Sequence, residues 1–182
     1  MEGQIQTTLL VPEGTFIRGD IEVFVPTYQI ALLPIMRYQF LSFVHDISGY
    51  TCSEWWPNGE FQKRDGESIY RYDRGSSNLP MTYVSWCEAM AFMAWLNETS
   101  PCKGRFKWRL PIKIELEKVI RNSLILPHSN WEWCFNQYGD TQVCYHFPKE
   151  SLYSSRILHK NIRSYNIGFR CALGFRDVVA DA

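Results

Sequence analysis

Cysteine and histidine are the side chains of this sequence that could carry redox or metal chemistry, and their spacing does not favour either. No two cysteines form C-x-x-C, which gives neither a zinc ribbon nor a thioredoxin motif. The histidines are equally isolated, and only Cys144 and His146 lie close enough to suggest a metal pair, with a plain surface pair as the alternative. We expect no metal or cofactor and free, largely buried thiols. The six cysteines are Cys52, Cys87, Cys102, Cys134, Cys144 and Cys171.

Acidic and glycine-rich patterns for catalysis are also missing from the sequence. Glu115 and Glu117 fall on one short predicted helix without a nearby acid–base partner, so paired-carboxylate hydrolysis has no support. There is no glycine-rich phosphate loop. Asn97-Glu98-Thr99 is a glycosylation sequon, but without a secretory signal it carries little meaning. We therefore assign no catalytic residue.

The bulk properties restrict the class of partner. The chain has 182 residues, which predicts a single domain over residues 1–182. Lysine plus arginine and aspartate plus glutamate are 19 each, and this balance argues against a nucleic-acid or anionic-membrane surface. No signal peptide or apolar run of about 18 residues is visible, so a cytoplasmic location is expected. Seven Trp and ten Tyr can serve both a core and a binding surface.

Helical periodicity appears three times, with short strands between. The apolar spacing predicts helices over residues 35–44 and 112–121, and a third over Val84–Thr99. Ser85 and Glu88 at the start of the third form a capping box. Strands are expected at Ile21–Ile30, which we treat as one strand, and near residues 156–158 and 166–173. A further strand is expected to end near Trp108, where Arg109 and Leu110 lead into Pro111, and a polar segment runs from 135 to Lys149.

Residues 50–80 have no regular period. They mix Trp, Tyr and Phe with Gly, Ser, Asn and Pro, a composition that resembles binding loops. Loops of this length in a compact domain are usually functional or disordered. The alternative is an irregular loop in which Trp55 and Trp56 fold inward as a small satellite core.

Six short motifs, in a fixed order along the chain, resemble those of the sulfatase-modifying-factor family, which includes the formylglycine-generating enzymes. Pro80–Leu96 is similar to the family's P-V-x-x-V-S-W-x-D-A-x-A-Y-x-x-W-L, and Arg109–Glu117 to its R-L-P-T-E-A-E-W-E. The remaining motifs are Glu13–Gly19, Ile30–Phe43, Trp131–Trp133 and Ile167–Cys171.

The resemblance implies an α+β fold of the C-type-lectin-like class. In it two main helices pack on short antiparallel strands, with much irregular loop. It also implies structural roles for the motif side chains, because buried Arg and Trp groups need fixed hydrogen-bond partners. These residues are Trp86, Arg109, Trp131, Trp133, Gly168 and Arg170.

The departures from the family pattern bear on function. The family's oxidase binds copper(I) through two nearby thiolates before the final G-F-R, and this chain has no cysteine between Ser151 and Phe169. Arg156–Lys160 stands where the family carries R-V-x-R-G-G-S-W, so the catalytic loop looks deleted. Met36 and Ile112 stand where a capping Thr is usual, and each lost cap typically costs about 1 kcal/mol.

We therefore predict a non-catalytic module that binds a protein or peptide. A subunit held inside a larger assembly is a second hypothesis. A reduced, copper-dependent formylglycine-generating oxidase that uses another thiol pair is the enzyme alternative. The predicted binding residues come from the loop 50–80 and from segment 159–165: Trp55, Trp56, Tyr70, Tyr72, His159, Asn161, Arg163 and Tyr165.

Overall fold

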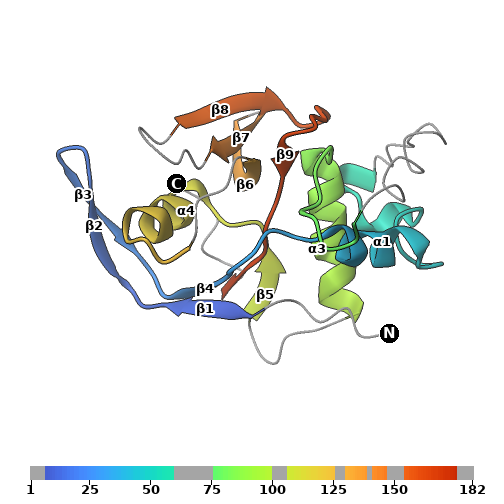
Figure 1. The fold of residues 1–182 in the computed structure, drawn as a ribbon, viewed down its shortest axis with the longest axis horizontal. Coiled ribbons are helices and arrows are strands. Elements are labelled where there is room, and N and C mark those ends of the chain that lie inside the picture. Colours follow the sequence, from blue (N-terminus) through green and yellow to red (C-terminus); the bar gives the residue numbers. More distant parts are fainter. Residues whose placement is uncertain are drawn as a thin grey trace.

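The computed structural model describes residues 7–59, 76–99, 106–125, 130–138, 141–146 and 154–175 (Figure 1). Its α-helices are α1 (Arg37–His45), α3 (Trp86–Thr99) and α4 (Lys113–Arg121), with short 3₁₀ helices η1 (Ser53–Trp55) and η2 (Pro57–Gly59). The strands are β1 (Thr8–Val11), β2 (Gly14–Arg18), β3 (Ile21–Val25), β4 (Tyr28–Ala31), β5 (Phe106–Arg109), β6 (Trp131–Tyr138), β7 (Thr141–His146), β8 (Ser154–His159), β9 (Ile167–Gly168) and β10 (Ala172–Phe175).

The described strands form three small sheets. Their orders are β1-β4-β10-β5, β2-β3 and β8-β7-β6-β9. All pairs are antiparallel except β6 with β9. Helix α4 lies between the β2–β3 hairpin and the sheet of β6 to β8, whereas α1 and α3 lie together at the other end (Figure 1). This arrangement confirms the predicted α+β class.

Strand β6 separates two parts of the core. Trp133 belongs to the larger cluster with α1 and α3, and the next residue, Cys134, belongs to the cluster around α4. Successive strand residues point to opposite faces, so one strand serves both sides. The larger cluster is strongly aromatic: Phe92 lies 5.8 Å from Phe40 and 5.5 Å from Phe169, measured between ring centroids. Offset and edge contacts of this kind add to the gain from burial.

The N-terminal hairpin is fastened to α4 by both apolar and charged contacts. Phe16 and Val25 are buried in the cluster around α4. The Lys118 Nζ donates to the backbone carbonyls of Pro12 at 2.8 Å and Gly14 at 3.2 Å. Burial lowers the pKa of Lys118, and the Glu13 carboxylate opposes this shift. The Lys118 ammonium group therefore holds the start of the β2–β3 hairpin against α4.

Two strand predictions need correction. Ile21–Ile30 is not one strand: β3 and β4 lie in different sheets, with Pro26 between them. Proline has no N–H to donate, so a continuous paired strand is disfavoured there. The segment described above only as polar contains β7, which pairs along its length with β8.

The helix starts follow the expected chemistry where the sequence provides it. Ser85 N–H donates to the Glu88 carboxylate at 2.7 Å and Glu88 N–H donates to the Ser85 hydroxyl at 3.2 Å, which confirms the capping box. The side chain of Met36, the N-cap of α1, has no oxygen that could accept a hydrogen bond from the first helical turn. Its own N–H still donates to the Gln39 side chain at 2.8 Å, so half of the reciprocal arrangement survives.

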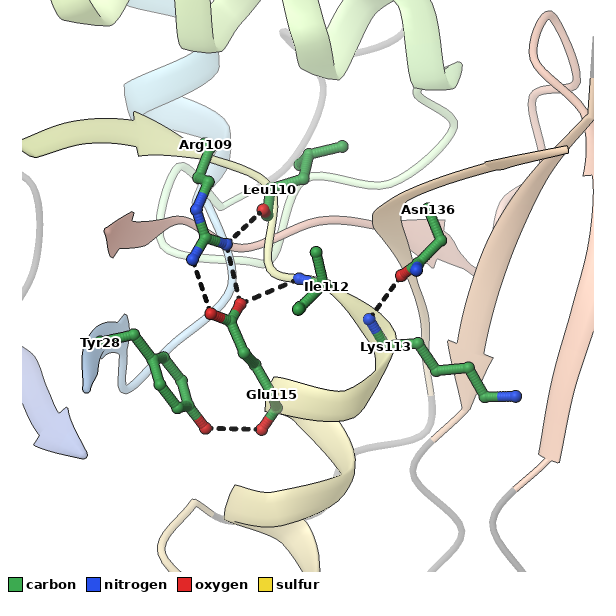
Figure 2. A network of polar contacts seen from close by, with 7 residues as sticks. All are labelled: Tyr28, Arg109, Leu110, Ile112, Lys113, Glu115 and Asn136. Atoms are coloured by element: carbon green, nitrogen blue, oxygen red, sulfur yellow. Dashed lines mark hydrogen bonds and ion pairs between the residues drawn. The ribbon is translucent and has the colours of Figure 1, made fainter. Parts of the chain in front are cut away.

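A buried polar network fixes the start of α4 (Figure 2). The Arg109 guanidinium makes two bonds to Glu115, at 2.7 and 2.6 Å, and a third to the Leu110 carbonyl at 3.1 Å. Ile112 N–H donates to the same carboxylate at 3.0 Å, and the Tyr28 hydroxyl donates to the Glu115 carbonyl at 2.7 Å. Burial, aided by the Glu115 charge, raises the pKa of Tyr28 well above its usual range. Arg109 therefore joins β5 to the helix that follows it.

The thiols behave as the sequence predicts in the described part of the chain. Cys87, Cys134 and Cys171 are buried and Cys52 is half-buried, and none of the four forms a disulfide. The side chains of Cys102 and Cys144 lie outside the described residues. No helix among the described residues is both long enough and apolar enough to cross a bilayer.

Candidate functional site

The site begins with residues 159–165, which we call the C-terminal turn and which follow β8. Ile162 N–H donates to the His159 carbonyl at 3.0 Å and closes the turn. Two backbone hydrogen bonds then attach the turn to the start of α3 and to the residues just before it. Trp86 N–H donates to the Lys160 carbonyl at 3.1 Å, and Tyr83 N–H donates to the Ser164 carbonyl at 2.9 Å. The C-terminal turn is therefore held in place by the start of a helix that lies far away in sequence.

Glu88 is the side chain that joins these segments. It is completely buried, and its carboxylate accepts bonds from Tyr50 Oη at 2.7 Å, Ser85 N at 2.7 Å and Arg163 Nε at 2.9 Å. The Arg163 side chain is 23% exposed, so its charge lies partly in solvent. Charge-assisted hydrogen bonds to a buried carboxylate are among the stronger polar contacts in proteins. Glu88 therefore takes part in the capping box of α3 and also holds the C-terminal turn through Arg163.

Tyr83 has a backbone conformation that is unusual for a bulky residue. Its φ is 61°, in the left-handed region. Side chains with a Cβ rarely adopt this region, and such strain tends to persist at functional sites, where it costs about 1–3 kcal/mol. Two residues earlier, the backbone of Met81 packs closely against Gly168, where an added Cβ would overlap the Met81 carbonyl oxygen. This overlap explains the glycine of the I-G-F-R motif.

Three large side chains are exposed around this junction. Tyr165 is 82% exposed, Ile162 is 43% exposed and Tyr83 is 42% exposed. We call these three residues the exposed patch. Sequence reasoning found only Tyr165. Tyr83 lies within a motif that was assigned to the core, and its positive φ has no sequence signature. Ile162 looks like an ordinary core residue.

The other predicted residues of the C-terminal turn differ in their contacts. His159 is exposed, and its Nδ1 accepts a bond from Asn161 N–H at 3.3 Å. Asn161 is also exposed, and its side-chain oxygen lies 3.5 Å from the buried Cys87 Sγ. Arg163 is committed to Glu88, so it positions the turn and is only partly available to a partner.

Of the four aromatic residues predicted from the loop 50–80, the structure describes Trp55 and Trp56. Trp56 is a correction: it is buried, and its Nε1 donates to the Tyr50 carbonyl at 2.9 Å, because the apolar ring packs in the large core. Trp55 is half-buried, and its Nε1 donates to the Ser48 carbonyl. Tyr70 and Tyr72 lie outside the described residues.

The six motif residues all lie in the interior. The Trp133 Nε1 donates to the Val84 carbonyl at 2.8 Å, and the Trp86 Nε1 donates to the Cys134 carbonyl at 2.9 Å. The Arg170 guanidinium makes two bonds to Glu132, at 2.6 and 2.9 Å. The Trp131 ring is covered by Arg156, whose Cζ lies 4.7 Å from the ring centroid. With Arg109 in its network and Gly168 against Met81, these residues join helices to strands.

The thiol chemistry of copper(I) does not fit the described residues of this region. Two facing thiolates are the donor set that suits this ion. Among residues 154–175 the one cysteine is Cys171, which is completely buried and belongs to the core. Across the described part of the chain, no three His, Cys, Asp or Glu side chains gather in a group that could hold a metal.

The order of elements and the buried motif residues agree with the C-type-lectin-like fold that the family resemblance implies. The family described as sulfatase-modifying factor enzyme 1-like domain matches residues 1–124, and the chain belongs to this family. No curated protein matches. Among solved structures, the crystal structure of CarF is similar in fold: the TM-score is 0.65 at 12% sequence identity, and the match covers 94% of this chain and 98% of that chain.

Proposed function

We propose that this protein is a non-catalytic binding module for a protein or peptide, acting alone or as a subunit of a larger assembly. The observation that carries the proposal is the exposed patch of Tyr83, Ile162 and Tyr165 on a rigidly held turn. The balanced formal charge supports a protein partner over nucleic acid or an anionic membrane.

The physical chemistry of the patch suits recognition. Tyrosine offers a large, rigid and amphipathic surface with few torsions to immobilise, and it is common among interface residues that contribute most to affinity. The backbone bonds to Tyr83 and Trp86 and the Glu88–Arg163 pair already order the turn. Binding therefore requires little further loss of conformational entropy, which favours affinity.

The donor set of this region supports the absence of catalysis. The family resemblance implies that the substrate is handled near this turn, and here the chain offers His159, Asn161 and Tyr165 where the oxidase needs thiols. A copper-dependent formylglycine-generating oxidase remains the rival function. It would have to use a thiol pair from outside the C-terminal turn, for example one that includes Cys87, whose Sγ lies 3.5 Å from the Asn161 side-chain oxygen, or Cys144 on β7, which pairs with Arg156 of β8.

The test compares alanine variants in binding to the partner that co-purifies with the native protein. Tyr165→Ala should weaken binding by about 1–2 kcal/mol or more while leaving the melting temperature unchanged. Phe24→Ala is the matched control, because Phe24 is also a largely exposed aromatic residue, on the distant β2–β3 hairpin (Figure 1). Equal losses for both variants would reject the site. Aldehyde formation on a sulfatase-motif peptide, with copper and oxygen present, would reject the non-catalytic function.

A further inference from the structure

Within the described part of the chain, strand β8 lies at the edge of its sheet. Among the described segments only β7 pairs with it, and the register runs without a shift from Thr141 opposite His159 to His146 opposite Ser154. In an antiparallel pair every second residue of the outer strand turns its N–H and C=O away from its neighbour. Natural proteins usually protect such edges with charged side chains, proline, bulges, short strands or a covering segment. Strand β8 contains one charged side chain, Arg156, but no proline and no bulge against β7, and Ile157 on it is 60% exposed.

The two edges of the four-stranded β1-β4-β10-β5 sheet are less suited to adding a strand. On β5, the outer side is already used by Asn97, whose side-chain oxygen accepts from Trp108 N–H at 2.8 Å and whose amide donates to the Trp108 carbonyl at 2.8 Å. This contact also gives the Asn of the glycosylation sequon a structural role. Strand β1 has four residues and no charge to select a partner.

The charged side chains of β8 and of the residues that follow it as far as Phe175 are all positive. Residues 154–175 contain four Arg or Lys and no Asp or Glu. Arg163 and Arg170 are paired with buried carboxylates, whereas Arg156 is exposed above the Trp131 ring. Lys113, from α4, brings its Nζ to within 3.0 Å of the Ser155 hydroxyl on the other face of the strand, where the Glu117 carboxylate, 3.9 Å from the same Nζ, offsets its charge.

The positive charge of Arg156 favours an acidic segment over a second copy of the chain as the strand that pairs with β8. A second copy of the chain would add its own Arg156 to the same short ladder, and like charges across a strand pair are unfavourable. An extended segment that carries Asp or Glu would be attracted to the face of β8 that carries the exposed Arg156. Main-chain hydrogen bonds would supply affinity, and alternate side chains would supply specificity.

We propose that the partner binds as an acidic, extended peptide segment that adds a strand to the free edge of β8. The inference rests on the proposed binding function and names its partner chemistry. Because β8 leads directly into the C-terminal turn, a segment paired with β8 is brought toward Ile162 and Tyr165. The exposed patch and the open edge then form one continuous surface.

The experiment measures hydrogen exchange of the β8 amides by NMR, with a short synthetic peptide of alternating valine and glutamate as the probe. Binding should slow exchange at the amides that point away from β7 and should weaken as salt is added. A peptide with lysine in place of glutamate should bind about tenfold more weakly or worse. Arg156→Glu should remove the preference for the acidic peptide. Lys107→Glu, a charge reversal at an exposed site on β5, is the matched control and should not.

Each possible result of this experiment either supports or contradicts the binding of an acidic strand to β8. Slowed exchange confined to β8 and specific to the acidic peptide supports it. It fails if no peptide protects β8, if both peptides bind equally well, or if the protection falls elsewhere. Concentration-dependent protection without peptide would indicate a second copy and would also overturn it. Should Arg156→Glu fail to fold, the two peptides on the native chain still decide. A partner that depends on Tyr165 while no peptide protects β8 would leave the proposed function intact and reject only the edge.

Discussion

Glu88→Gln is the perturbation that tests the structure of the site most sharply. The carboxylate accepts three described hydrogen bonds, from Tyr50, Ser85 and Arg163, and it is completely buried. Glutamine keeps the shape but offers only one acceptor oxygen, so at least one buried donor loses its partner. The charge-assisted bond to Arg163 contributes about 1.5–3 kcal/mol, and a stranded buried donor costs about 1–3 kcal/mol.

The total cost is smaller than these two contributions added together, because Arg163 is partly exposed and water can solvate its charge. We expect a loss of about 3 kcal/mol in the free energy of unfolding, near the lower end of values for breaking a buried ion pair. For a chain of this size each kcal/mol lowers the melting temperature by about 2–4 °C, so the shift should be roughly 6–12 °C. The loosened turn should also expose the amides of Tyr83 and Trp86.

The assay is urea unfolding, followed by hydrogen exchange at these two amides. Glu98→Gln is the control, because Glu98 lies on the same helix and is exposed. It should change the unfolding free energy by no more than about 0.5 kcal/mol. The reasoning is refuted if Glu88→Gln costs less than about 1 kcal/mol, or if exchange at Tyr83 and Trp86 stays at the native rate.

Three further predictions concern the core, the strained residue and acid stability. Trp133→Ala should cost about 3–5 kcal/mol in urea unfolding, because the ring is completely buried; an unchanged melting temperature would contradict its placement. Tyr83→Gly should leave the unfolding free energy within about 1 kcal/mol of native, since release of the strained φ offsets lost packing, yet it should reduce partner binding. Bonds from Ser48 and Trp95 lower the pKa of Asp46, so its carboxylate stabilises the fold above the unfolded pKa of about 4 and loses this effect as pH falls. The stability difference between the native chain and Asp46→Asn should therefore shrink from pH 7 to pH 3; a constant difference would count against the hydrogen-bonded carboxylate.

Local rules recovered much of this fold from the sequence. The Ser85–Glu88 capping box depends on residues three apart, and the structure contains it as predicted. The second role of Glu88 was not predictable, because Arg163 lies 75 residues away and only the tertiary fold brings them together. Likewise, burial of Trp56 depends on packing against Tyr50 and the large core rather than on any periodic pattern.

Only part of the candidate site could be predicted from the sequence, because the rest depends on the tertiary fold. Exposure of Tyr165 followed from its place outside the motifs. Tyr83 was hidden because apolar residues within a motif are usually assigned to the core, and a positive φ at a non-glycine residue has no sequence marker. The free edge of β8 required knowledge of the strand order, which the sequence pattern did not provide.

Site-directed photo-crosslinking in the native host tests the central claim most directly. A photoreactive phenylalanine analogue would replace Tyr165 in one variant and Phe24 in another, since both positions are exposed but lie on different parts of the fold. We predict one discrete crosslinked protein or peptide from position 165 and none from position 24. No crosslink from position 165, or the same products from both positions, would contradict a binding site at the C-terminal turn.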